Sequence, residues 1–517
     1  MIPVLTVSQM RAIDEASIGN DLNTGYSYML KAGMGLFLAI KEIVPLAGDG
    51  EIAVVCGKGN NGGDGYVVAR LLLEAGYQVM CYSLYDTGEL RREAKRAFDE
   101  YVGRKGNILV VDDAGDFSGF ARYRLIVDAM LGTGAKGDPR GMCAMAIQAV
   151  NESKVPVVAV DTPSGLESDT GIPGNPCIRA AVTVTMGFPK IGQYWHPGRG
   201  NVGKLVIHDI GYPDEVVEEH SSSCFAPAIA HLKDLLPPRK PAGSKFDHGL
   251  ALLLCGSRGM TGSATLAALA AMRTGCGMTH LAAPFSAVPI LSQKLTETVI
   301  HGIPETAEGT PARPAFAKLR ELATSMQALC IGPGISHNDE TSALVRESIS
   351  TLPLPAILDA DGINAYKGRA EELGSHKGDL LVTPHRGEWK RLFGELPSTP
   401  SGTIEAVRSM AAGYRMTVLL KGSPSIVVDP AGEVAILPFG NSALAKAGTG
   451  DVLSGIIVSL MAQGMAVTGA AILGAYLHGE AGTLASRTLG EYSVIAGDVV
   501  ERLPLVIKSL CEANAQE

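Results

Sequence analysis

Three loops in the first half of the sequence combine glycine with carboxylate, amide and hydroxyl side chains, which are groups that bind ions and phosphates. They are GKGNNGGDG at 57–65, VDAMLGTGAKGD at 127–138 and VDTPSGL at 160–166. The first loop follows an apolar run and opens a helix, so backbone N–H groups and the helix dipole can hold a phosphate there. It is neither a Walker loop nor a standard dinucleotide fingerprint, and a tight turn is the alternative interpretation.

Two aspartates stand where apolar runs of the first half end. Asp128 and Asp161 occupy equivalent strand ends, which directs both carboxylates to one edge of a sheet, although each could simply cap the turn that follows. Asn61, Asp128 and Ser164 supply only oxygen donors of low total charge. Such a set suits a hard cation, including a monovalent one, better than zinc.

The second half carries the stretch AGTGDVLSG at 447–455, whose glycines precede an apolar helix. Backbone N–H groups at that helix terminus can meet a developing negative charge. Asp451 can act there as a general base, and phosphoryl transfer needs this pairing of base and anion hole. An ordinary acidic residue in a first turn is the alternative. Lys421 could bind a nucleotide phosphate or be an exposed turn lysine, and His385 could contact substrate or be a turn histidine.

Alternating strand and helix signals position these loops. Short apolar runs predict strands at Ile52–Cys56, Tyr77–Tyr82, Leu125–Ala129, Val155–Val160, Leu250–Cys255, Ala328–Ile331, Ala356–Leu358, Leu380–Val382 and Thr417–Leu420. Helices are predicted at Tyr66–Ala75, from Asp451 to about Gln463 and from Thr468 to about Ser486. The pattern predicts an α/β protein with mostly parallel sheets and helices on both faces. Ligands of such sheets bind beyond the carboxyl ends of the strands.

Composition narrows the class of protein further. The chain has 517 residues, 46% of them hydrophobic, a net charge of −9 and a pI near 5.7, which favours two or more globular domains and disfavours nucleic acid as a partner. Nine cysteines without a C-x-x-C pair predict free thiols in a reducing compartment, the cytoplasm. Thr6 and Gln9 have capping-box spacing, so the start of the chain predicts a helix instead of a signal peptide. We find no apolar stretch long enough to span a membrane.

The first-half motifs NNGGDG, VDAMLGTGAKGD, VDTPSGLESDTG and VTVTMGFPKIG resemble the NAD(P)H-hydrate epimerase family, in that order. The resemblance implies a Rossmann-like three-layer domain over residues 1–215, a potassium ion near Asn61, Asp128 and Ser164, and Asp161 acting at the hydrated ring. It implies that the substrate's phosphates and ribose are bound by Asn60, Asn61, Gly62, Gly63, Asp64, Gly132, Thr133, Gly134, Ala135, Lys136, Gly137 and Asp138. Thr162 departs from the isoleucine usual in the family, but the aspartate and the Pro-Ser-Gly turn are intact.

The second-half motifs GSRGMTGSA, IGPG, LDADGIN, TPHRGE, LKGSPS and FGNSALAKAGTGDVLSGI resemble the ribokinase-like NAD(P)H-hydrate dehydratase family. The resemblance implies that ADP, or ATP in other members, phosphorylates the ring hydroxyl of the hydrate, and that phosphate then leaves. Asp451 is the implied base, and Gly334, His385 and Asp451 contact the substrate. The implied nucleotide-binding residues are Lys421, Gly422, Ser423, Pro424, Ser425 and Gly450. A magnesium ion bridging the phosphates is expected, with Asp359 and Asp361 as candidate ligands.

The two resemblances converge on one pathway, because an epimerase supplies the hydrate epimer that the dehydratase accepts. We therefore expect an epimerase domain at 1–215, a linker at 216–240 that is rich in proline toward its end, and a dehydratase domain at 241–517. The expected partners are the hydrates of NADH and NADPH, ADP and further copies of the chain, without nucleic acid or membrane. The alternative is a ribokinase-type small-molecule kinase whose first half binds nucleotides or serves as a scaffold.

Overall fold

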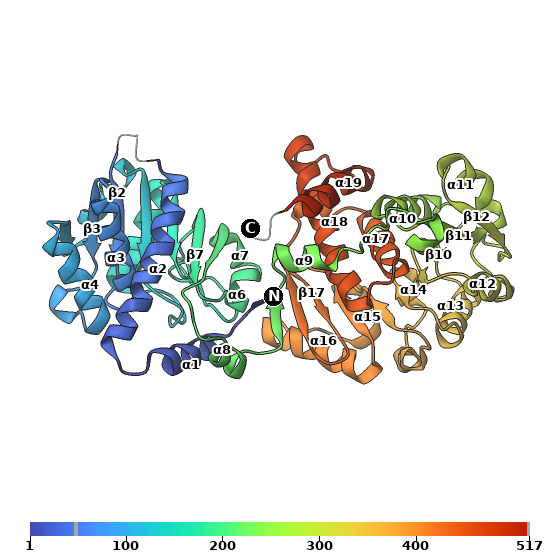
Figure 1. Cartoon of the computed structure of the whole chain (residues 1–517), viewed down its shortest axis with the longest axis horizontal. Coiled ribbons are helices and arrows are strands. Elements are labelled where there is room, and N and C mark those ends of the chain that lie inside the picture. The colour runs from blue at the N-terminus through green and yellow to red at the C-terminus, as the bar shows by residue number, and fades with distance from the viewer. Residues whose placement is uncertain (46–49, 514–517) are drawn as a thin grey trace. The chain divides into compact units, whose positions relative to one another are not determined.

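The computed structural model describes residues 1–45 and 50–513 and divides the chain into two compact units. One unit is Pro3–Cys224, and the other is Phe225–Glu517 together with Met1–Ile2 (Figure 1). The division falls inside the segment 216–240 that we predicted as the linker. That segment contains the end of α8 (Asp214–His220), the strand β9 (Cys224–Ala226) and α9 (Ile229–Leu235).

A parallel seven-stranded sheet forms the centre of the first unit. Its order is β4 (Asn107–Val110), β3 (Val79–Ser83), β2 (Ile52–Cys56), β5 (Leu125–Ala129), β6 (Val157–Val160), β7 (Val182–Met186) and β8 (Lys204–His208). Every residue of the central strand β2 is buried, as an all-apolar strand covered on both faces requires.

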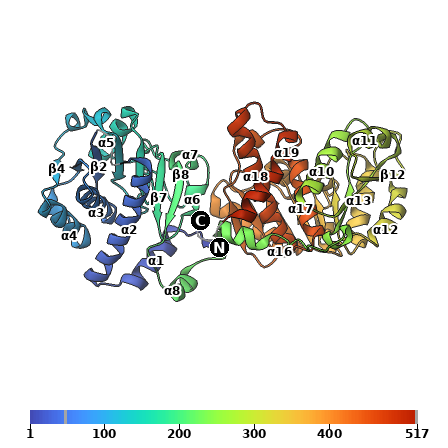
Figure 2. The same ribbon diagram turned by 45° about the horizontal axis from the view of Figure 1, so that its top comes forward.

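Helices cover both faces of this sheet. They are α2 (Leu22–Ile43), α3 (Asn60–Glu74) and α4 (Arg92–Gly103) on one face and α5 (Gly141–Ser153) on the other (Figures 1 and 2). Successive side chains of a strand point to opposite faces. Val54 and Cys56 therefore pack with α2 and α3, while Ala53 and Val55 pack with α5. The predicted three-layer Rossmann-like arrangement is confirmed.

The second unit is built on an eleven-stranded mixed sheet. Its order is β1 (Ile2–Pro3), β9, β18 (Val434–Leu437), β17 (Ser425–Val428), β16 (Thr417–Leu420), β15 (Leu380–Val382), β14 (Ala356–Leu358), β13 (Ala328–Ile331), β10 (Leu250–Leu254), β11 (Met278–Pro284) and β12 (Val299–Ile303). Strands from β16 to β12 pair in parallel, and β16, β17 and β18 pair antiparallel. The predicted α/β class is thus confirmed for both units.

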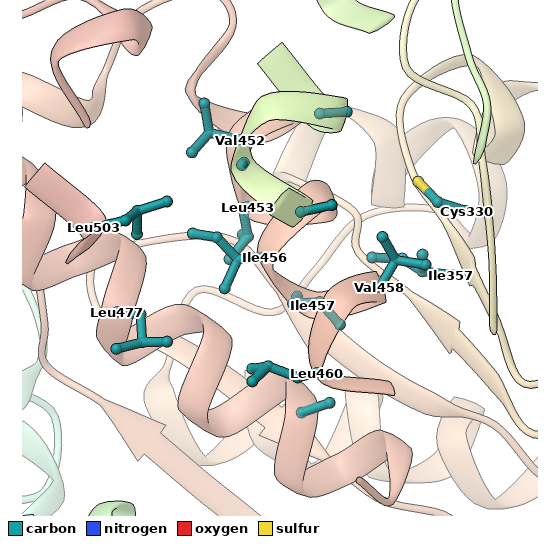
Figure 3. Close-up of a cluster of buried hydrophobic side chains, with 14 of the residues drawn as sticks. Cys330, Ile357, Val452, Leu453, Ile456, Ile457, Val458, Leu460, Leu477 and Leu503 are labelled. Atoms are coloured by element: carbon teal, nitrogen blue, oxygen red, sulfur yellow. The ribbon is translucent and has the colours of Figure 1, made fainter. Parts of the chain in front are cut away.

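One helix of the second unit, α17 (Thr449–Ala462), is buried almost all round. Figure 3 shows its Ile456 and Val458 within an apolar cluster that also holds Ile357 of β14 and Leu477 of α18. The neighbouring helices are α10 (Thr261–Thr274), α18 (Val467–Leu489) and α19 (Ala496–Glu512). Each such Ile or Leu contributes about 1.5–3 kcal/mol on burial. The packing fixes α17, and with it the position of its N-terminus.

Several predicted elements are confirmed, and two predictions were wrong. The strands β13, β14, β15 and β16 have the predicted bounds. Helix α3 begins at Asn60 and not at Tyr66. Glycines in its first turn obscured this start in the sequence, and close packing requires glycine there: a Cβ on Gly62 would lie 1.9 Å from the Gly57 carbonyl oxygen. We predicted two closing helices, whereas a third, α19, follows them despite Pro504 in its interior.

The capping box of Thr6 and Gln9 is present at the start of α1 (Val7–Ile18). Within residues 1–45 and 50–513, none of the helices is long and apolar enough to cross a membrane.

Candidate active sites

Asp128 and Ser164 form the centre of the first site. Asp128 lies near the end of β5, and its carboxylate accepts hydrogen bonds from the Ser164 backbone N–H (2.8 Å) and hydroxyl (2.5 Å). Burial raises the pKa of Asp128 to about 6, although these hydrogen bonds oppose the shift. The Asn61 amide donates to the Leu131 carbonyl (3.0 Å), and the Leu131 N–H donates to the Ser164 hydroxyl (2.9 Å). The three residues predicted to hold a cation are therefore close together.

Asp161 follows β6 and pairs with a buried lysine. Its φ of +60° is unusual for a residue with a side chain, and such conformations are concentrated at functional sites. The Lys190 ammonium lies 2.5 Å from the Asp161 carboxylate, which also accepts hydrogen bonds from the Thr185 hydroxyl (2.9 Å) and the Met186 N–H (3.2 Å). One carboxylate oxygen receives all three contacts, so the orientation of Asp161 is fixed.

Two further acidic groups lie near Asp161. Burial, together with the carboxylates of Asp161 and Asp14, raises the pKa of Asp64 well above its ordinary value, and no described residue donates a hydrogen bond to it. Burial also raises the pKa of Asp14, whose carboxylate accepts a hydrogen bond from the Tyr212 hydroxyl. The site thus combines an ion-paired aspartate with an aspartic acid whose protonated form is favoured.

The two predicted phosphate-binding segments are Asn60–Asp64, at the start of α3, and the largely exposed loop Gly132–Asp138. Gly57 lets the turn before α3 approach the turn after β5, since a Cβ on Gly57 would lie 2.0 Å from the Met130 carbonyl oxygen. The guanidinium of Arg11 lies beside the second segment, 2.7 Å from where a Cβ on Gly134 would stand. Helix α1 therefore adds a cation to this loop.

Asp451 defines the second site. It is the third residue of α17, directly after Gly450, and its carboxylate accepts a hydrogen bond from the Ser263 side chain of α10. Burial raises the pKa of Asp451 to about 6, an effect that Ser263 opposes and that nearby Asp359 reinforces. A carboxylate with this pKa is mostly ionised at neutral pH and is still basic enough to take a proton.

Lys421 and Asp359 form a buried ion pair at the same place. The Lys421 ammonium lies 2.6 Å from the Asp359 carboxylate and 3.7 Å from that of Glu388. Burial alone would raise the pKa of Asp359, but Lys421 and hydrogen bonds from Ser454 and Thr383 hold it below its ordinary value. A Cβ on Gly450 would lie 3.8 Å from both charged groups, so the pair stands directly against the turn before Asp451.

The remaining predicted residues of this half surround that pair. His385 caps α15 (Arg386–Phe393) by accepting a hydrogen bond from the Gly387 N–H (2.9 Å). Its side chain is half exposed, and its Nε2 lies 3.6 Å from the Glu388 carboxylate. Gly334 has a φ of +66° and lies against Ser263, the partner of Asp451. In the loop after Lys421, Gly422 and Ser423 are exposed, Pro424 is buried, and the Ser425 hydroxyl bonds to the Gly422 carbonyl (3.1 Å).

Sequence reasoning missed the residues that hold these groups in place. They are Lys190, Thr185, Asp14 and Arg11 in the first site and Ser263, Ser454, Thr383 and Glu388 in the second. All but Asp14 and Arg11 stood inside motifs quoted above, namely VTVTMGFPKIG, GSRGMTGSA, TPHRGE and AGTGDVLSG. The usable signal was strongest for Lys190 and Glu388, because Lys190 is the sole basic residue of VTVTMGFPKIG and Glu388 is the sole acidic residue of TPHRGE.

The acidic residues do not form a transition-metal site. Over residues 1–45 and 50–513, histidine, cysteine, aspartate and glutamate form no group of three that could hold a metal ion. Asp359 is occupied by Lys421, Ser454 and Thr383, and Asp361 accepts a hydrogen bond from the Ser336 N–H and lies 3.2 Å from His337. Residues of the chain thus already contact both carboxylates, most fully that of Asp359, and the magnesium role considered from the sequence stays a prediction.

Each unit thus carries carboxylates and glycine-rich turns at the carboxyl ends of its strands, which defines an α/β enzyme with two sites. Residues 25–192 match the family model described as YjeF-related protein N-terminus, and residues 251–505 match that of NAD(P)H-hydrate dehydratase. The chain is 36% identical to the bifunctional NAD(P)H-hydrate repair enzyme of Moorella thermoacetica, over 98% of this chain and 97% of that protein. It is 34% identical to the enzyme of that name from Salinibacter ruber, over 98% and 96%.

A solved structure also resembles the second half. The ADP/ATP-dependent NAD(P)H-hydrate dehydratase of Bacillus subtilis, co-crystallised with ATP and Mg²⁺, is 29% identical over 55% of this chain and 97% of that chain, with a TM-score of 0.48. The full-length relatives contain both halves at comparable length. The chain therefore belongs to the family of bifunctional NAD(P)H-hydrate repair enzymes.

Proposed function

We propose that the chain repairs hydrated NADH and NADPH by two reactions. The first unit interconverts the R and S hydrates, and the second converts the S hydrate to NAD(P)H, with ADP as phosphoryl donor and AMP and phosphate as products. We propose domain limits of 1–215 and 241–517 for these activities. The observation that carries the proposal is the arrangement of Asp451, the turn at Gly450 and Lys421 around one point. The full-length relatives of the chain are named bifunctional NAD(P)H-hydrate repair enzymes, which supports it further.

In the second site, Asp451 takes the proton from the ring hydroxyl as its oxygen attacks the terminal phosphorus of ADP. The N-terminus of α17 and the Lys421 ammonium stabilise the charge on the transferring group. Phosphorylation replaces hydroxide, a poor leaving group, by phosphate, a good one. The ring nitrogen then donates its lone pair as the carbon–oxygen bond breaks, and loss of a proton from the adjacent carbon restores the dihydronicotinamide.

Four other parts of the second site bind the reactants in this proposal. The turn Gly422–Ser425 and Gly450 hold the nucleotide, and His385 and Gly334 contact the hydrate. The half-exposed side chain of His385 supports its role, because part of the ring stays accessible while Nδ1 caps α15. A magnesium ion would be held mainly by the nucleotide phosphates and water, in keeping with its preference for these oxygens, and would offset the charge of the phosphates.

In the first site, epimerisation requires the bond between the ring carbon and its hydroxyl oxygen to break and to re-form on the opposite face. The ring nitrogen supplies the electrons, and the departing hydroxyl takes a proton to leave as water. Asp64 gives that proton in this proposal, which is supported by the burial that raises its pKa well above its ordinary value. Asp161, oriented by Lys190, accepts a proton from the water that returns. The segments Asn60–Asp64 and Gly132–Asp138, with Arg11, bind the phosphates and ribose.

Asn61, Asp128 and Ser164 fit a potassium ion. Their donors are an amide, a carboxylate and a hydroxyl oxygen, which suit a hard cation, and the Asp128 carboxylate has no cationic side chain among its hydrogen-bond partners. When bound, the ion would neutralise the buried carboxylate and supply a fixed positive charge beside the site. We also propose a cytoplasmic enzyme that forms homo-oligomers; the nine free cysteines support a reducing compartment.

Absorbance recovery at the reduced-nicotinamide band tests the proposal, with mixed hydrate epimers and ADP, ATP or no nucleotide. We expect complete recovery of the absorbance with ADP and incomplete recovery with ATP or without a nucleotide. Recovery that stops near the share of one epimer would contradict the epimerase role of the first unit. A phosphorylated product without recovery would favour the ribokinase-type kinase.

A further inference from the structure

The buried pair of Asp359 and Lys421 is more than a contact within the second site. Three adjacent parallel strands, β14, β15 and β16, are followed directly by Asp359, Thr383 and Lys421. Thr383 lies between the charged residues and donates a hydrogen bond of 2.9 Å to the Asp359 oxygen that receives Lys421. The Ser454 hydroxyl of α17 donates to the other oxygen at 2.7 Å. One carboxylate therefore joins three strand ends to the helix that carries Asp451.

The exposure of the two charged side chains differs. Lys421 retains 21% of its side-chain surface and Asp359 only 2%, so the lysine faces the site and the aspartate lies behind it. The Lys421 backbone is fixed as well, because its N–H donates to the Pro384 carbonyl at 2.8 Å. The flexible part of Lys421 is its side chain, and Asp359 is the group within 3 Å that fixes the ammonium.

Without Asp359, two other carboxylates would compete for the ammonium. Glu388 lies 3.7 Å away, and Asp451 is close enough for each group to affect the charge of the other. A lysine paired with Asp451 would neutralise the proposed base and leave its place against the anion-binding turn.

We infer that Asp359 is a positioning residue for phosphoryl transfer, which holds Lys421 against the turn before α17 and keeps its ammonium from pairing with Asp451. The inference rests on the proposed roles of Lys421 and Asp451. It predicts that the charge of Asp359 is needed for turnover although Asp359 touches neither nucleotide nor hydrate.

Asp359→Asn tests this role, because asparagine keeps the shape and some hydrogen bonds but removes the charge. We expect kcat of the dehydratase to fall by about 10²-fold, the scale of a small misplacement of a catalytic group. ADP affinity, measured by calorimetry, should change less than kcat. Asp429→Asn is the matched control: this carboxylate accepts a hydrogen bond from the Glu433 N–H in the turn between β17 and β18 and should leave turnover unchanged.

The pH profile separates positioning from a general loss of structure. The groups that set the charge of Asp451 are Ser263, Asp359, Lys421 and Asp361. Removing Asp359 takes away one cause of its raised pKa and frees Lys421, which lowers that pKa. The acid limb of kcat/KM should therefore move to lower pH in Asp359→Asn and stay in place in Asp429→Asn.

A double-mutant cycle with Lys421→Met completes the test. If Asp359 acts through Lys421, adding Asp359→Asn to Lys421→Met lowers kcat no further. Additive losses, or wild-type kcat in Asp359→Asn, would overturn the inference.

If Asp359→Asn does not fold, Ser454→Ala takes its place as the test variant. A smaller loss of kcat is then expected, and wild-type kcat in Ser454→Ala would again overturn the inference. Normal turnover of Asp451→Asn would instead refute the proposed function itself.

Discussion

Each unit contains one buried Asp–Lys ion pair at its site, and the two pairs are oriented oppositely. In the first unit Asp161 is 17% exposed and Lys190 is 1% exposed, whereas in the second Lys421 is 21% exposed and Asp359 is 2% exposed. The accessible partner is a carboxylate where the proposed chemistry moves protons, and an ammonium where it stabilises phosphate. The same ion pair can therefore serve either reaction, according to which member faces the ligand.

The comparison of the two sites predicts the largest loss of activity at Asp451, which belongs to neither of the two Asp–Lys pairs. Asp451→Asn removes the proposed base and should lower dehydratase turnover by about 10²–10⁴-fold. ADP binding should persist, because Lys421 and the anion-binding turn remain. Phosphate release and calorimetric titration with ADP measure the two quantities. Epimer interconversion in the same variant serves as the control and should keep its wild-type rate.

The next effect concerns stability. Removing the accessible partner leaves the buried partner unpaired, so Asp161→Asn and Lys421→Met should each lower the free energy of unfolding by about 3–5 kcal/mol. Lys190→Met and Asp359→Asn each leave the more exposed partner, whose charge water can solvate. These two variants should therefore lose less of the free energy of unfolding. Urea unfolding of the four variants measures this order. A larger loss in Lys190→Met than in Asp161→Asn would contradict the assigned orientation of the first pair.

Acid should inhibit the dehydratase through protonation of its base. Burial raises the pKa of Asp451 to about 6. The ionised form is the active one, so kcat/KM should be level above this value and fall about tenfold for each pH unit below it. Rates from about pH 4.5 to about pH 8, with saturating nucleotide, measure this fall of kcat/KM on the acid side. A profile that stays flat to the ordinary carboxylate range would argue against a buried base.

Potassium should stabilise the first unit only when Asp128 is ionised. Burial raises the pKa of Asp128 in the folded protein to about 6, from an ordinary value of 3.8, so ionisation destabilises the fold as pH rises through this interval. A bound cation offsets that cost above the folded pKa, by about 2.7 kcal/mol at a concentration a hundred times Kd. Melting temperatures at about pH 7.5 and about pH 5, with lithium chloride at equal ionic strength as control, measure the difference. Asp128→Asn should abolish the potassium-dependent gain at the higher pH.

The sequence predicted the strand ends of the sites better than the contacts between them. Strands such as β14 and β16 are apolar runs bounded by polar loops, and their bounds follow from local pattern. The contact between Asp359 and Lys421 joins residues 62 apart, and that between Asp161 and Lys190 joins residues 29 apart. Such pairs depend on strand order and helix packing, which no local pattern specifies. The same holds for Arg11, which α1 brings to Gly134.

Following both hydrate epimers by chromatography with ADP, in the wild type, Asp161→Ala and Asp451→Asn, tests the central claim that two sites perform two reactions. We expect the wild type to consume both epimers. Asp161→Ala should consume the S epimer while the R epimer persists. Asp451→Asn should interconvert the epimers without forming NAD(P)H. Equal consumption of both epimers by Asp161→Ala, or formation of NAD(P)H by Asp451→Asn at the wild-type rate, would contradict this claim.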